Sequence, residues 1–119
     1  MFEIIEDPQF VEDVKVDVPD GEGWKPQTLR TRFRVLRASD AETIMNDNDA
    51  VALLERIVIQ FEDLCDQSGK PVPGDGEWRS KLLDYGFVRV ALVRAYFEAV
   101  GRVRSGNSAS SAAPGLAPN

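Results

Sequence analysis

Residues 29–35 of the chain read LRTRFRV, in which apolar or small side chains alternate with arginines. Residues 13–18 read DVKVDV and alternate with the same period of two. This period is typical of a β-strand with one apolar and one polar face. The intervening residues include prolines and glycines, which favour a long loop over residues 19–28 that carries Trp24. The sequence therefore predicts an antiparallel β-hairpin near the N-terminus.

The middle of the chain predicts two helices, each with its own start signal. Ser39 followed by Glu42 reads as a capping box with Ser39 as the N-cap. Asn48 or Asp49 can cap a second helix over residues 50–64, whose apolar positions cover a wide face. Within that segment the IVI stretch at 57–59 is β-branched, so its end can instead be a strand.

The last third of the chain predicts a loop and two more helices. The loop spans residues 67–76, and the helices span residues 77–83 and 87–104. The polar stripe of the last helix is narrow and consists of Arg94, Glu98 and Arg102. So wide an apolar surface is either covered completely by the hairpin and the middle helix or leaves a surplus for a partner or for self-association. We expect the last and middle helices to form a face for a client protein or for self-association.

These elements together predict an α+β fold, in which an N-terminal antiparallel β-hairpin packs on a small bundle of three to four helices. A length of 119 residues suits one domain, which we expect over residues 1–104. Residues 105–119, SGNSASSAAPGLAPN, have no charged and almost no bulky side chains, so they predict a flexible tail.

Composition narrows the function classes. The net charge of −6 disfavours nucleic acids and anionic membranes as partners, and no apolar run approaches the roughly 20 residues of a membrane span. The chain has no histidine, the usual general base and metal ligand, so we expect no enzyme, no cofactor and no metal. The single cysteine, Cys65, excludes an internal disulfide and fits a reducing cytoplasm.

Local clusters of reactive residues favour ordinary structural roles. The carboxylates Glu62, Asp63 and Asp66 have no spacing that separates an acid from a base, so solvated surface charge is the better interpretation. A calcium loop with Gly69 at its sixth position would begin at Leu64, which cannot ligate. Cys65 lies on a mostly apolar segment and is expected in the core.

Protein-binding candidates remain. Residues 30–37 hold four of the 14 basic residues, and the arginines are expected either to meet an anionic partner or, preferably, to pair across the hairpin with Asp13 and Asp17. Trp24 is the better exposed tryptophan candidate, while Trp78 suits a core role equally well. The full candidate set is Trp24, Arg30, Arg32, Arg34, Phe61, Trp78, Val93, Tyr96, Phe97 and Val100.

Taken in order, these features resemble the small tail assembly chaperones of long-tailed bacteriophages and prophages. The resemblance lies in the hairpin that closes on residues 31–36 (TRFRVL), the acidic capped helix after Ser39 and the segment 49–64 (DAVALLERIVIQFEDL). The segment 66–72 (DQSGKPV) and the last helix through Tyr96 complete it.

The resemblance implies a chaperone that binds the long helical tape measure protein and helps to recruit tail tube subunits. Its expected partners are the tape measure protein, the tail tube protein and further copies of itself. It would act in the bacterial host cytoplasm and be missing from the finished virion.

The sequence leaves two alternatives open. One is a structural component of a phage particle, such as a head–tail completion or minor tail protein, which would be found in purified virions. The other is a small enzyme that uses Glu62, Asp66 and Asp75, which requires these carboxylates to converge in a pocket.

Overall fold

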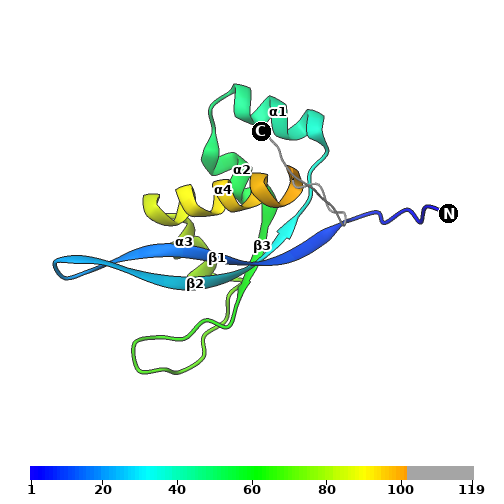
Figure 1. Cartoon of the computed structure of the whole chain (residues 1–119). Coiled ribbons are helices and arrows are strands. Elements are labelled where there is room, and N and C mark those ends of the chain that lie inside the picture. The colour runs from blue at the N-terminus through cyan, green and yellow to red at the C-terminus, as the bar shows by residue number, and fades with distance from the viewer. Residues whose placement is uncertain (102–119) are drawn as a thin grey trace, which may run out of the picture.

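The computed structural model describes residues 1–101 and has the expected α+β class, with a three-stranded antiparallel sheet and four helices (Figure 1). The elements, in chain order, are β1 (Gln9–Asp20), β2 (Gly23–Arg34), α1 (Ala38–Asn46), α2 (Ala50–Ile57), β3 (Val58–Glu62), α3 (Glu77–Leu83) and α4 (Gly86–Gly101). The sheet order is β1-β2-β3. The expected tail at 105–119 and the end of the last helix at 102–104 lie outside the described residues.

The hairpin is longer than its alternating segments predict. Strands β1 and β2 pair from Gln9 opposite Arg34 to Asp20 opposite Gly23. The expected loop over residues 19–28 is therefore wrong, and Trp24 lies in β2. The prolines did not break the pairing because proline is tolerated on strands that have a free edge. The tight turn begins at Gly21, whose φ of +62° suits glycine.

The middle segment divides into a helix and a strand. α2 ends at Ile57, and the β-branched residues that follow form β3, which pairs with β2. Of the two alternatives for residues 58–62, the strand is the correct one. The expected hairpin is thus one part of a larger sheet.

Of the two expected helix caps, the structure confirms one and contradicts the other. Asp49 caps α2 as expected, because its side chain accepts a hydrogen bond of 2.9 Å from the amide of Ala52. The capping box is wrong: α1 begins at Ala38, after an extended N-cap residue Arg37, and makes no side-chain cap bond. Ser39 lies inside the helix, where its carbonyl accepts a bond from the Thr43 hydroxyl.

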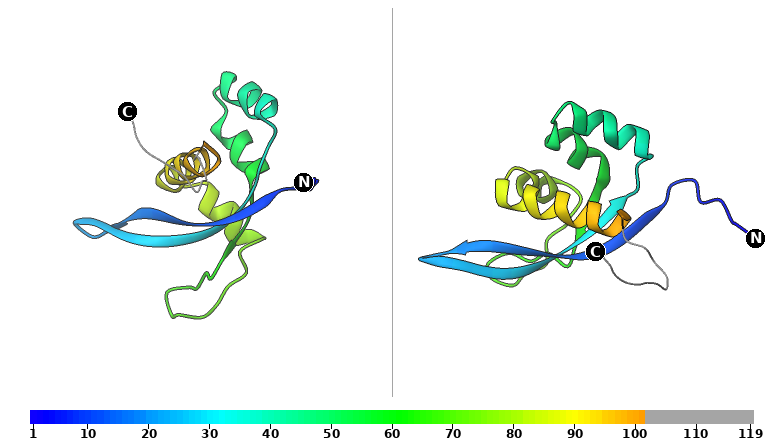
Figure 2. Two further views of the ribbon diagram at one scale, coloured as in Figure 1. Left: turned by 45° about the vertical axis from the view of Figure 1, so that its right-hand side comes forward. Right: turned by 45° about the horizontal axis from the view of Figure 1, so that its top comes forward.

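The core lies between the sheet and the helices. Figures 1 and 2 show α4 over one face of the hairpin, with α2 beside it. The buried face of α4 consists of Val88, Leu92, Tyr96 and Ala99. It packs with buried residues from β1, β2, α2 and β3, namely Val14, Val16, Phe33, Leu53, Leu54, Ile57, Val58 and Phe61.

Candidate functional site

The solvent side of α4 carries a second apolar row. Val90, Phe97 and Val100 keep 59%, 37% and 42% of their surface exposed, and Val93 is half-buried. Their spacing of three, four and three residues places them along one side of a helix. We call these four residues the α4 band. They are separate from the buried row, so α4 is apolar on two sides.

The C-terminal half of the α4 band borders a groove between α1 and α4. The groove has a volume of about 460 Å³, and Met45 of α1, which is 40% exposed, lies on its far wall. Most of the lining is apolar, and Glu42 is its one charged residue. The groove is lined by Val35, Leu36, Ala38, Ala41, Glu42, Met45, Asn46, Tyr96, Phe97 and Val100.

Two of the expected binding residues are buried. Phe61 keeps 2% of its surface and Tyr96 keeps 1%, so neither offers a contact surface to a partner, and those two expectations are wrong. Phe61 turned inward because β3 places it opposite Thr31 on the core face of the sheet. The Tyr96 hydroxyl accepts a hydrogen bond of 3.0 Å from the Leu36 amide, which ties α4 to the end of β2.

The tryptophans lie on a different part of the surface. Trp24 is 66% exposed and makes an edge contact with Phe87, 6.5 Å between ring centroids. Trp78 is 37% exposed, with the Lys81 ammonium 4.7 Å from its ring centroid. Neither lines the α1–α4 groove, so the structure does not bring the expected candidates into one site.

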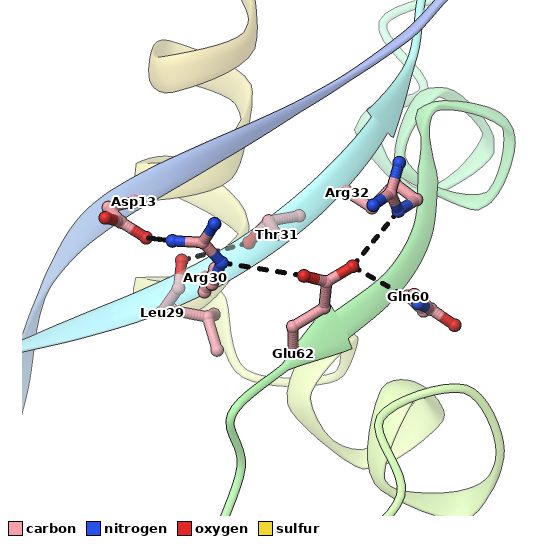
Figure 3. Close-up of polar contacts among 7 residues, drawn as sticks. All are labelled: Asp13, Leu29, Arg30, Thr31, Arg32, Gln60 and Glu62. Atoms are coloured by element: carbon pink, nitrogen blue, oxygen red, sulfur yellow. Dashed lines mark hydrogen bonds and ion pairs between the residues drawn. The ribbon is translucent and has the colours of Figure 1, made fainter.

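The arginines of β2 pair with carboxylates, as preferred from the sequence. Asp13 is one of these carboxylates, as expected, and Glu62 and Asp7 are further partners. Arg30 lies between Asp13, at 3.1 Å, and Glu62, at 3.5 Å, and Arg32 lies 3.0 Å from Glu62. Figure 3 shows how these side chains face one another. Arg34 contacts Asp7 at 2.8 Å. Asp17, the other expected partner, makes no ion pair within residues 1–101.

Hydrogen bonds on this part of the surface favour the ionised forms of two carboxylates, Glu62 and Asp7. Hydrogen bonds from Gln60 and Arg32 hold the pKa of Glu62 below its usual value. Hydrogen bonds from Arg34 and Gln9 likewise lower the pKa of Asp7. Arg30, Arg32 and Arg34 thus each have a carboxylate partner within the chain, which favours the pairing interpretation over an anionic partner site.

Reversing the charge of Arg32 tests that interpretation. We expect Arg32→Glu to lower the melting temperature by a few degrees, because it sets two carboxylates side by side on an exposed surface. Client binding should stay unchanged. Arg56→Glu, at an exposed arginine of α2, is the matched control for the change in net charge. Loss of binding in a folded Arg32→Glu variant would make this face a partner site.

The carboxylates that an enzyme would need do not meet. Glu62 belongs to the arginine network, whereas Asp66 accepts bonds from the backbone of Ser68 and Lys70 and closes a turn. Among residues 1–101 no three of His, Cys, Asp and Glu are grouped as a metal site would require. Cys65 is exposed rather than buried, because Leu64 and not Cys65 packs on the core.

The search for related proteins gives no assignment: no family model matches the chain, and neither the curated proteins nor the solved structures contain a match. In the described part of the chain no helix has the length and apolar character that a membrane span requires.

Two exposed apolar residues are not among the candidates from the sequence: Val90 of the α4 band and Met45 of the α1–α4 groove. Val90 was detectable, since it continues the spacing of Val93, Phe97 and Val100 by three residues. Met45 was not, because only the tertiary structure places it on the same groove as Phe97 and Val100.

Proposed function

We propose that this chain is a tail assembly chaperone of a long-tailed phage or prophage, which binds helical segments of the tape measure protein in the α1–α4 groove. The observation that carries the proposal is the α4 band, an exposed apolar row with the spacing by which one helix packs on another. The order of sequence features that resembles such chaperones supplies the identity of the client.

The geometry of the groove fits an amphipathic helix. Met45 and Val100 lie on its two walls, and Phe97 supplies an aromatic side chain that is only partly covered. An apolar groove between two helices takes the apolar stripe of a third helix and leaves its polar side in water.

The charge of the chain fits the same role. A holdase must mask apolar stripes on its client and keep the complex in solution. A net charge of −6 supplies repulsion between complexes, while the groove itself carries a single charged residue, Glu42.

Co-expression with the neighbouring tape measure protein tests the proposal. We expect the two proteins to co-purify and the tape measure protein to stay soluble only when this chain is present. Failure to co-purify would overturn the proposal. Recovery of this chain from purified virions would instead favour a structural component of the particle.

A further inference from the structure

The two edges of the sheet differ in whether another segment of the chain pairs with them. At β3 the amide of Phe61 donates to the carbonyl of Gly74 at 2.9 Å, and Val72 donates to Leu64, so the loop covers that edge. Within residues 1–101 β1 pairs with β2 alone. Alternate residues of an edge strand direct their backbone N–H and C=O groups outward, where they can pair with another strand.

Space is present beside this edge. A groove of about 440 Å³ lies between β1 and α4, with Lys15 and Asp17 on one side and Val90 and Arg94 on the other. Figure 1 also shows that the turn end of the hairpin projects past α4. Part of the β1 edge is thus open to a second chain.

Charged side chains on an edge strand prevent pairing with most other strands. Here they occur in a self-complementary order, since the chain reads Lys15-Val16-Asp17. Antiparallel pairing of two copies about Val16 sets Lys15 of each copy opposite Asp17 of the other. It also sets Val14 opposite Val18. Pairing centred on Lys15 or on Asp17 would instead oppose like charges.

Both charged residues are available for such pairing. Lys15 and Asp17 are exposed, and neither forms an ion pair with another described residue. The neighbouring Asp13, by contrast, is already paired with Arg30. This favours the Val16-centred register over one that would pair Lys15 with Asp13.

We infer that two copies of this chain associate through their β1 edges, antiparallel about Val16, and that Lys15–Asp17 pairs select this register. The interface is distinct from the α1–α4 groove proposed for the client, so it goes beyond the proposed function.

Analytical ultracentrifugation of the purified full chain over a range of concentrations tests the inference. We expect the wild type to form dimers. Lys15→Glu and Asp17→Lys should each weaken the dimer about tenfold or more, because each change converts two attractive cross-strand pairs into repulsive ones. Lys70→Glu, in the loop after β3, is the control and should dimerise like the wild type.

A mixing experiment identifies the pairing itself. Lys15→Glu mixed with Asp17→Lys should form heterodimers, since every Glu or Asp then faces a lysine, and the double variant in one chain should regain the homodimer. A wild type that stays monomeric throughout, or single variants that dimerise normally, would overturn the inference. Client capture by a monomeric chain would leave the proposed function intact, so the two failures are distinguishable.

Discussion

Replacing Gly74 by alanine should destabilise the fold by about 3 kcal/mol or more. A Cβ at this position would overlap the backbone of Phe61, lying 2.6 Å from its carbonyl carbon and nearer still to its carbonyl oxygen. Backbone cannot move aside as a flexible side chain can. The substitution should therefore break the hydrogen bond from Phe61 to Gly74 and lift the loop from β3.

Chemical denaturation of Gly74→Ala beside Gly86→Ala measures this effect. Gly86 is the first residue of α4 and a Cβ there meets nothing within 4 Å, so alanine should be neutral or slightly stabilising. Equal unfolding midpoints for Gly74→Ala and the wild type would show that the loop does not lie against β3 as described.

Placing a glutamate on each wall of the α1–α4 groove should abolish client binding. Met45 and Val100 are 40% and 42% exposed, so the double variant Met45→Glu/Val100→Glu should fold normally. In the complex each glutamate would be desolvated against an apolar helix. We expect the affinity for the tape measure protein to fall at least about a hundredfold. A loss of this size is typical when two residues at the centre of an interface are removed.

Val51→Glu is the matched control for the groove variant. Val51 is 46% exposed on α2 and lines a separate pocket with residues of α2 and α3 and with Arg89. The Val51→Glu variant should bind the client with the affinity of the wild type. If both variants lower the affinity for the tape measure protein equally, the client face is instead shared by the middle and last helices, as expected from the sequence.

Local patterns in the sequence were sufficient for much of the fold. The alternation in residues 13–18 and 29–35 predicted both strands of the hairpin, and α3 begins and ends at the expected residues. The extension of the hairpin through Pro19 and Pro26 was not predictable from breaker residues, because it depends on whether a strand has a second neighbour. The identity of β3 likewise depended on β2 as a pairing partner.

The site was only partly predictable for the same reason. The narrow polar stripe of the last helix correctly indicated that α4 is apolar on more than one side. The sequence does not show which apolar row faces the core, so it does not separate Tyr96, which is buried, from Phe97, which is 37% exposed. The sequence leaves the segment of Phe61 open between helix and strand, and only the pairing of β3 with β2 shows that this side chain faces the core.

Site-specific photo-crosslinking in the co-expressed complex tests the central claim most directly. A photoreactive residue at Val100, in the groove, should crosslink to the tape measure protein, and one at Val51 should not. Crosslinks from Val51 alone, or from neither position in a complex that does co-purify, would contradict binding of the client in the α1–α4 groove.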